Sequence, residues 1–530
     1  MHDDLPLRTL NDVLDHAARR FGDRTALTDG QRRYTFADVR ADVLRAAGGL
    51  QELGVRSGDR VAIWLGNRAE WYVAFFAAVR VGAIVVPLNT GLSVPEAEYQ
   101  LTQSGATVVI TAAAYRSRRL ADDALSISAN GGGRLRVVAV GPNVPAGATP
   151  WSEIESGPSS PAAAVPVAPD DPVVMLYTSG TTGLPKGAVH THRFLPSLLS
   201  AAQRLELSED DCVVLYLPLF HVYALMAGLV LMTAAGAKLV LMERFDAAQS
   251  LALMAAERAT VVYGVPTTYI DQLADPAIDT ADLSSVRVSI TPFGYDLCQR
   301  VGKRFGACLN TFGMTETASM ALLPRLDDDP ETAVRTIGTP LDGLEARVVD
   351  EAGETPAPVG SPGALQLRGP LIMSEYWDKP AETAAAFDRK GWFRTGDIAR
   401  VDEHGQFTFV GRRGDHYRVG GESVDPVEVE AALQAHPFVE RAAVLGVADP
   451  RLGSVGHAWV QPRRGVQAVD EEALRQHVAS RLAFFKVPRG IHVVTQLPTT
   501  PSGKVQKYKL RRLLEGEGGQ PGAPGERDIP

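Results

Sequence analysis

A stretch rich in glycine and hydroxyl groups carries the side chains best suited to chemistry in this chain. The apolar run Val173–Tyr177 predicts a strand, and the sequence TSGTTGLPKG follows it at positions 178–187. Glycine permits positive φ and close backbone approach, so hydroxyl and N–H groups can surround a polyanion there. Lys186 adds a positive charge. The stretch predicts a cradle for nucleotide phosphates, formed by Thr178, Ser179, Gly180, Thr181, Thr182, Gly183 and Lys186.

This cradle differs from the common phosphate loop of NTPases. In that loop glycine immediately precedes the lysine, and serine or threonine follows it. Here Pro185 precedes Lys186 and Gly187 follows it. The alternative interpretation is a surface turn that is simply rich in small residues. The missing NTPase loop also argues against a transporter ATPase.

Five further segments follow the cradle along the chain. They are PLFH at 218–221, FGMTET at 312–317, GWFRTGD at 391–397, GR at 411–412 and PSGK at 501–504. In this order, and together with the cradle, they resemble the motifs of the adenylate-forming superfamily. That superfamily includes acyl-CoA synthetases, the adenylation domains of peptide synthetases and firefly-type luciferases. The resemblance covers nearly the whole chain and is strongest to an acyl-CoA synthetase.

The resemblance implies a nucleotide site for ATP or AMP. Thr315 would bond the α-phosphate, and Glu316 would hold Mg²⁺, which prefers carboxylate and phosphate oxygens. Phe312 would stack near adenine. Asp397 would accept hydrogen bonds from both ribose hydroxyls. Arg412 would also reach the nucleotide.

Two further residues are implied as catalytic groups by the same resemblance. Lys504 would enter the site for adenylation and bridge the substrate carboxylate and the α-phosphate, two anions that otherwise repel each other. The alternative is a solvated lysine near the end of the chain. His221 would gate or line the acyl pocket, with a purely structural histidine as the alternative.

The acyl pocket is implied to draw on apolar and tyrosine-rich segments. Its residues would be Tyr223, Tyr263, Ser289, Ile290, Thr291, Pro292 and Gly313. This composition favours an apolar or aromatic acid over a highly charged one.

Two positions depart from the family pattern. Where the family carries a Gly-Gly-Ala-Pro turn, this chain places SITP at 289–292, so that Ile290 replaces a glycine. At the hinge, Gly414 stands where the family carries Asp or Lys, and Asp415 follows it. Glycine can absorb the backbone rotation of a hinge but offers no polar contact. Two outcomes are open: a reshaped pocket with normal activity, or weakened adenylation with thioester formation retained.

Composition limits the class of protein. The net charge of −9 argues against a broad basic face that binds nucleic acid. The three cysteines show neither metal-ligand spacing nor a disulfide framework. The N-terminal sequence lacks the features of a signal peptide, and no apolar window is long enough to predict a membrane span. We therefore expect a cytoplasmic protein.

The order of helices and strands predicts an α/β fold. Amphipathic helices alternate with short apolar strands, which favours largely parallel sheets. Residues 1–411 are predicted to form a large domain, with stacked α/β subdomains at about 1–170 and 171–336 and a β-barrel-like subdomain at 337–411. Residues 412–515 are predicted as a small, mobile α+β domain, and 516–530 as a disordered tail. Gly420 and Gly421 of the small domain would line a tunnel for coenzyme A.

The resemblance implies an enzyme that joins a small-molecule carboxylic acid to CoA. An acyl-AMP would form from the acid and MgATP, and domain alternation would then allow the thiol to attack it. Two alternatives are a ligase impaired in adenylation, which works mainly on a supplied acyl-adenylate, and a stand-alone enzyme that loads a separate carrier protein. Because Glu316, Asp397 and Lys504 are all present, a non-catalytic nucleotide binder is disfavoured.

Overall fold

The computed structural model gives the chain as two compact units. It describes residues 7–157, 165–178, 185–292, 295–350, 355–412, 417–419, 422–449, 452–466, 468–482, 484–500 and 505–514. The first unit comprises Met1–Ser361, Leu365–Thr395 and Val401–Thr408. The second comprises Pro362–Ala364, Gly396–Arg400 and Phe409–Pro530. The main division therefore falls at Phe409, and two short segments that precede it in sequence pack with the second unit.

An eight-stranded sheet of the first unit carries the ends of the predicted cradle. Its order is β19-β9-β8-β4-β3-β5-β6-β7. The strands are β3 (Arg60–Trp64), β4 (Ile84–Pro87), β5 (Ala106–Ala112), β6 (Arg136–Val140), β7 (Thr149–Pro150), β8 (Pro172–Thr178), β9 (Lys186–Thr191) and β19 (Glu375–Tyr376). Strands β3 to β8 are parallel, whereas β9 pairs antiparallel with β8 and with β19. The predicted parallel arrangement is confirmed for this sheet.

A nine-stranded sheet of the first unit carries the Thr-Glu motif. Its order is β16-β15-β14-β13-β12-β10-β11-β1-β2. The strands are β1 (Thr25–Asp29), β2 (Arg32–Thr35), β10 (Cys212–Leu215), β11 (Lys238–Leu241), β12 (Val261–Tyr263), β13 (Val288–Pro292), β14 (Ala307–Met314), β15 (Ser319–Leu323) and β16 (Thr339–Pro340). The run from β1 to β14 is parallel, and β2, β15 and β16 pair antiparallel.

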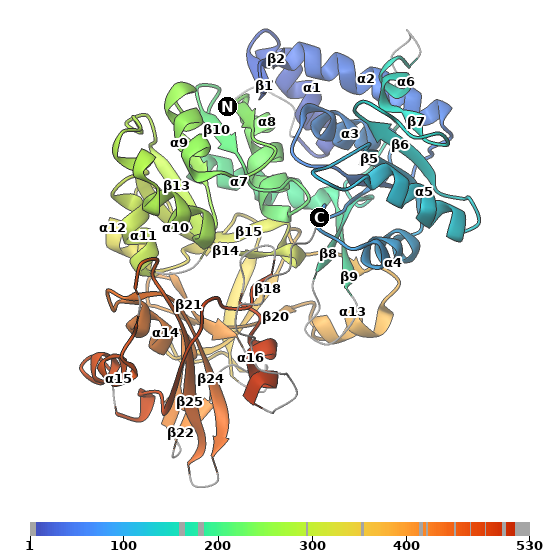
Figure 1. Cartoon of the computed structure of the whole chain (residues 1–530). Helices are drawn as coiled ribbons and strands as arrows, with labels where there is room; N and C mark the ends of the chain where they lie inside the picture. The colour runs from blue at the N-terminus through green and yellow to red at the C-terminus, as the bar shows by residue number, and fades with distance from the viewer. Residues whose placement is uncertain are drawn as a thin grey trace. The chain divides into compact units, whose positions relative to one another are not determined.

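Helices cover both sheets of the first unit (Figure 1). They are α1 (Leu10–Phe21), α2 (Phe36–Glu52), α3 (Ala69–Arg80), α4 (Val94–Ser104), α5 (Leu120–Asn130), α6 (Trp151–Glu155), α7 (Leu195–Arg204), α8 (Leu231–Ala235), α9 (Ala247–Ala256), α10 (Pro266–Ala274), α11 (Tyr295–Gly302), α12 (Pro330–Arg335) and α13 (Pro380–Ala386). A capping box begins α2, because Thr35 and Asp38 bond each other's backbone N–H. Helix α3 contacts β3 and β4 of one sheet and β1 of the other, so it lies between the two sheets.

The apolar stretch after Val222 adopts a helical geometry that the spacing of its residues does not reveal. Tyr223–Val230 is a π-helix, η2, which continues directly into α8. It contacts β10, β12 and β15 of the nine-stranded sheet. π-Helical turns are rare and occur frequently at functional sites. This one follows the PLFH motif immediately.

The second unit is a small sheet covered on both faces. Its sheet has the order β23-β22-β25-β24, with β26 beside β25. Its elements are β22 (Tyr417–Val419), β23 (Glu422–Val424), α14 (Pro426–Gln434), β24 (Val439–Asp449), β25 (Gly453–Pro462), α15 (Glu471–Ala479), η5 (Phe484–Lys486), β26 (Gly490–Val493) and α16 (Lys507–Leu514). Alternate residues of β24 face opposite cores: Val444 packs with α14 and α15, whereas Leu445 packs with α16.

Residues 337–411 were predicted to form a β-barrel-like subdomain. It contains a four-stranded sheet in the order β17-β18-β20-β21. The strands are β17 (Glu345–Val349), β18 (Gly363–Arg368), β20 (Phe393–Val401) and β21 (Phe407–Arg412). Across the described ranges, no helix has the length and apolar character that crossing a membrane requires.

Candidate active site

The strand pair β8–β9 brings the two ends of the cradle together. Thr178, the last residue of β8, pairs in register with Lys186, the first of β9. Helix α4 supports this closure, since the Tyr99 hydroxyl donates to the Pro185 carbonyl at 3.0 Å. The predicted cradle residues between them, Ser179, Gly180, Thr181, Thr182 and Gly183, lie outside the described residues. The structure thus fixes the ends of the predicted phosphate loop.

A tight turn presents the Thr-Glu motif at the end of β14. Thr315–Thr317 form a short 3₁₀ helix, η4, before the chain reverses into β15. The Thr317 hydroxyl lies within 3.0 Å of the Met314 backbone N and O and of the Ser319 carbonyl. Ala318 and Ser319 have φ of 46° and 100°, a region that non-glycine residues rarely adopt. Unfavourable backbone of this kind clusters at functional sites.

Tyr376 of β19 connects the cradle lysine to the motif glutamate. Its hydroxyl donates to Glu316 Oε1 at 2.8 Å, and the Lys186 ammonium lies 5.0 Å from the centre of its ring. Burial, followed by the nearby Glu316 charge, raises the pKa of Tyr376, so the hydroxyl remains a donor at neutral pH. Tyr376 could not be identified from the sequence, because its strand is only two residues long and lies about sixty residues beyond Glu316.

His190 of β9 contacts the same turn through the backbone of Thr315. Its Nε2 lies 2.8 Å from the Thr315 carbonyl oxygen. Burial lowers the pKa of His190 to about 4, so the ring is neutral at physiological pH. Because a carbonyl oxygen can only accept, the proton of the neutral ring belongs on Nε2. This contact could not be read from the sequence either, where the only hint was the position of His190 four residues after Lys186.

The surroundings of Glu316 fit a divalent cation. Glu316 is 6% exposed, and its carboxylate forms no ion pair with any residue in the described ranges. A buried carboxylate requires a compensating partner, and a hard cation is a suitable one. Mg²⁺ commonly uses one or two protein carboxylates together with substrate phosphates and waters, so a single buried carboxylate such as Glu316 can serve it.

Gly313 is required by close packing behind the motif. A Cβ atom at this position would lie 1.8 Å from the Ser319 carbonyl oxygen, which is backbone and cannot rotate away. We expect Gly313→Ala to destabilise the first unit by about 2–3 kcal/mol and to displace the Thr315–Glu316 turn. Urea unfolding measures this, with Gly131→Ala as the control, because a Cβ there makes an ordinary 3.4 Å contact. Equal stability of the two variants would contradict the packing argument.

Three tyrosines surround the segment that departs from the family pattern. The Ile290 carbonyl accepts from the hydroxyls of Tyr223 and Tyr269, both at 3.1 Å, and from the Gly264 N–H at 3.2 Å. Tyr263 packs edge-on against Tyr223, with ring centres 5.7 Å apart. Ser289, Ile290 and Thr291 are fully buried within β13, and Pro292 is partly exposed. Their role in an acyl pocket stays a prediction.

His221 lies where the PLFH motif enters the π-helix. Its ring packs against Phe220 with centres 4.8 Å apart. Burial lowers the pKa of His221 to about 4, so the ring is neutral at physiological pH and cannot form an ion pair with the carboxylate of an acid substrate. Phe312, the predicted adenine neighbour, is 2% exposed on β14. Gating by His221 and stacking by Phe312 both stay predictions.

The remaining predicted residues belong to the second unit. Asp397 is buried on β20, and Arg412 is the last residue of β21. Five others lie outside the described residues: the hinge residues Gly414 and Asp415, the tunnel residues Gly420 and Gly421, and the catalytic candidate Lys504. The first unit therefore collects the cradle ends, the Thr-Glu motif and the tyrosines, and the second unit contains the ribose and lysine candidates.

The base of the loop that carries Lys504 is nevertheless well defined. Thr499 and Val505 form an antiparallel bridge, and the Gln506 N–H donates to the Pro498 carbonyl at 2.8 Å. Directly after the loop, Lys507 forms a 2.8 Å ion pair with Glu430 of α14. These contacts hold both ends of the PSGK loop on the core of the second unit.

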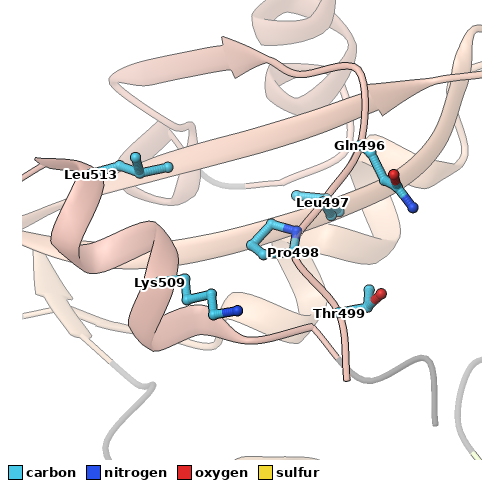
Figure 2. Close-up of a pocket in the computed structure, with 6 residues that line it drawn as sticks. All are labelled: Gln496, Leu497, Pro498, Thr499, Lys509 and Leu513. Carbon is cyan, nitrogen blue, oxygen red and sulfur yellow. The ribbon is translucent and has the colours of Figure 1, made fainter. Parts of the chain in front are cut away.

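An open pocket of about 480 Å³ lies beside this loop base. Figure 2 shows it between α16, which carries Lys509 and Leu513, and the segment Gln496–Thr499. Its lining contains one cation, no acid and no histidine. It therefore lacks the groups of the predicted catalytic chemistry.

Comparisons with known proteins agree with this arrangement. Residues 14–377 match the family model of the AMP-binding enzyme, and residues 428–504 match that of the AMP-binding enzyme C-terminal domain. A feruloyl-CoA synthase from Amycolatopsis sp. is 37% identical over 494 residues, which are 92% of this chain and 95% of that protein.

Solved structures are similar over the full length. The anthranilate CoA ligase AuaEII in complex with anthranoyl-AMP has a TM-score of 0.87 and 29% identity, covering 97% of this chain and 98% of that one. ATP-bound MatB from Rhodopseudomonas palustris has a TM-score of 0.85 and 30% identity, covering 96% and 99%. The chain therefore belongs to the family of AMP-binding enzymes and is an adenylate-forming, ATP-dependent acid–CoA ligase.

Proposed function

We propose that this ligase works in two steps on an aromatic carboxylic acid. In the first, a carboxylate oxygen attacks the α-phosphorus of ATP, the bond to the β-phosphate oxygen breaks, and pyrophosphate leaves. In the second, the CoA sulfur attacks the acyl carbon, its proton is lost, and AMP leaves. The observation that carries the proposal is the buried contact of Glu316, Tyr376 and Lys186 beside the closed ends of the cradle.

Each residue of the site has a defined part in this scheme. Lys186 and the cradle would bind the phosphates, and Thr315 the α-phosphate. Glu316 would hold Mg²⁺, which, when bound, neutralises phosphate charge. In the second unit, Asp397 and Arg412 would bind the ribose and Lys504 would bridge the two reacting anions. Alternation of the second unit about Gly414 would then bring Gly420 and Gly421 to the thiol.

The choice of an aromatic acid rests on two independent supports. Tyr223, Tyr263 and Tyr269 gather around the Ile290 carbonyl, and flat aromatic side chains suit a flat substrate. Two of the similar proteins carry an aromatic acid in their names, feruloyl-CoA synthase and anthranilate CoA ligase. The names of the same two proteins also contain CoA, which supports CoA as the thiol.

One assay separates this proposal from its alternatives. Pyrophosphate release is measured with ferulate, anthranilate, benzoate and octanoate, each with and without CoA, and synthetic feruloyl-AMP plus CoA is tested separately. We expect release with an aromatic acid and thioester only with CoA. Thioester from feruloyl-AMP without any pyrophosphate release would instead favour the adenylation-impaired ligase. Transfer to a phosphopantetheinyl carrier protein but not to CoA would favour the loading enzyme.

Lys504 provides a residue-level prediction for the first step. Lys504→Ala is expected to slow adenylation about a hundredfold, because a cation that bridges the two anions is lost. Thioester formation from feruloyl-AMP and CoA should stay near the wild-type rate. Lys509→Ala, which removes another lysine from the same unit, is the control. Equal loss in both half-reactions of Lys504→Ala would remove the assigned role.

A further inference from the structure

We propose that Tyr376 is a positioning residue that keeps Glu316 and Lys186 apart and separately oriented for metal-bound ATP. This inference rests on the proposed function, since it assigns those two residues to the cation and the phosphates. In this role Tyr376 contacts neither ATP nor the acid. It acts through the two charged side chains that it contacts.

A buried hydrogen bond from the Tyr376 hydroxyl orients the carboxylate of Glu316. The donor and acceptor atoms are 2.8 Å apart, and Tyr376 and Glu316 are 8% and 6% exposed. The terminal torsion of a glutamate is broad, so an unanchored carboxylate takes many orientations. A single hydroxyl donor can bind only one of the two oxygens. It therefore fixes the plane of the carboxylate and leaves Oε2 for a cation, since no described residue donates to Oε2.

The ring of Tyr376 also contacts Lys186. The ammonium lies 5.0 Å from the centre of the Tyr376 ring, within the range of a cation–π interaction. Across the described ranges Lys186 forms no ion pair, with Glu316 or any other acid. A ring face attracts the ammonium without neutralising its charge, unlike a carboxylate. The lysine thus keeps its full charge for phosphate.

Both contacts combine into one physical reason for a tyrosine. A cation and an anion that both lie against one tyrosine tend to pair with each other, and that pair would compete with the binding of both Mg²⁺ and phosphate. Tyr376 offers each a different surface, its hydroxyl to the anion and its ring face to the cation. Phenylalanine would supply only the ring, and leucine neither surface.

The backbone of Tyr376 is held independently of its hydroxyl. Tyr376 pairs with Ala188 of β9, and its N–H donates to Thr383 Oγ1 at 3.0 Å. On either side, Ser374 N donates to the Val189 carbonyl and Trp377 N to the Gly187 carbonyl, both at 2.8 Å. The ring also packs in a cluster with Ala188, Met373 and Phe393. Loss of the hydroxyl alone should therefore leave the strand and the ring in place.

The test compares Tyr376→Phe and Tyr376→Leu with the wild-type full chain. Binding of ATP without acid is measured by calorimetry across a Mg²⁺ titration and in EDTA. For Tyr376→Phe we expect the Mg²⁺ concentration for half-maximal tightening to rise about tenfold, with binding in EDTA unchanged. Tyr376→Leu should also weaken binding in EDTA, because Lys186 loses the ring.

A matched control exists on the surface of the same unit. The Tyr295 hydroxyl donates to Glu331 Oε1, also at 2.8 Å, in an exposed setting. Tyr295→Phe removes the same kind of hydrogen bond and should leave the Mg²⁺ response unaltered. An unaltered Mg²⁺ response in Tyr376→Phe, or an equal loss of binding with Mg²⁺ and in EDTA, would overturn the inference. Failure of the wild type to bind ATP at all would overturn the proposed function as well.

Discussion

Replacement of Glu316 by glutamine is expected to slow acyl-adenylate formation by about 10²- to 10³-fold. The amide oxygen can still accept from the Tyr376 hydroxyl, so the packing of the turn is retained. What is lost is the negative charge proposed to hold the cation on the phosphates. Pyrophosphate release with saturating acid and Mg²⁺ measures the effect. The same variant should convert feruloyl-AMP and CoA to thioester at close to the wild-type rate, since that step involves no pyrophosphate.

The control for this variant is Glu331→Gln. Glu331 also accepts a tyrosine hydroxyl and loses the same charge on substitution, but it lies at the surface beside Arg335. Its adenylation rate should equal that of the wild type. Partial recovery of Glu316→Gln at high Mg²⁺ would support the assigned role further. An adenylation rate within a factor of about three of the wild type would remove Glu316 from the reaction.

Acidification is expected to unfold the first unit between pH 6.5 and about pH 4. Burial lowers the pKa values of His190, His192 and His221 from 6.5 to about 4. In this interval the unfolded chain binds protons that the folded unit does not, so stability is present above pH 6.5 and is lost as the pH falls. His190 and His192, which are 1% and 2% exposed, give a slope of about 2.7 kcal/mol per pH unit, and the partly exposed His221 adds less. Summed to pH 4, the loss of about 7 kcal/mol from the two buried rings is comparable with the whole stability of a domain.

The unit that unfolds can be observed by itself. The chain has six tryptophans, and Trp459 alone belongs to the second unit. In a Trp459→Phe background, fluorescence during urea unfolding at a series of pH values reports on the first unit alone. His192→Asn should reduce the slope by about 1.4 kcal/mol per pH unit, because one titrating group is removed. Asparagine keeps the acceptor for the Leu10 N–H that His192 Nδ1 provides at 3.1 Å. A slope unchanged by His192→Asn would contradict this account.

Features encoded by neighbouring residues could be predicted from the sequence. The capping box at Thr35 and the short apolar strands Ile84–Pro87 and Lys238–Leu241 follow from the local sequence pattern. The central strand of the second unit, β25, does not follow from local pattern. Glycines at 453 and 456 and polar residues at 457 and 461 interrupt its apolar pattern, so its pairing with β24 decides its conformation.

The candidate site also contains residues that local motifs indicate and residues that only contacts between distant segments reveal. Lys186, Thr315 and Glu316 could be proposed from the sequence because their spacing within a motif is short and characteristic, and their roles stay predictions. Tyr376 and His190 were not, because each acts through a contact between segments distant in sequence. The π-helix at Tyr223–Val230 was also hidden, since a uniformly apolar run has no period from which the winding could be read.

The backbone that follows Glu316 has a consequence for the engineering of this enzyme. Ala318 and Ser319 occupy conformations, with φ of 46° and 100°, that glycine would adopt with less strain. A selection for heat resistance alone would therefore favour glycine at these two positions, and each such change would also loosen the chain next to Glu316, the carboxylate that we propose holds the cation. At positions 318 and 319, a substitution that raises thermostability is therefore expected to lower turnover. Libraries that seek a more robust ligase should hold positions 318 and 319 constant and search elsewhere.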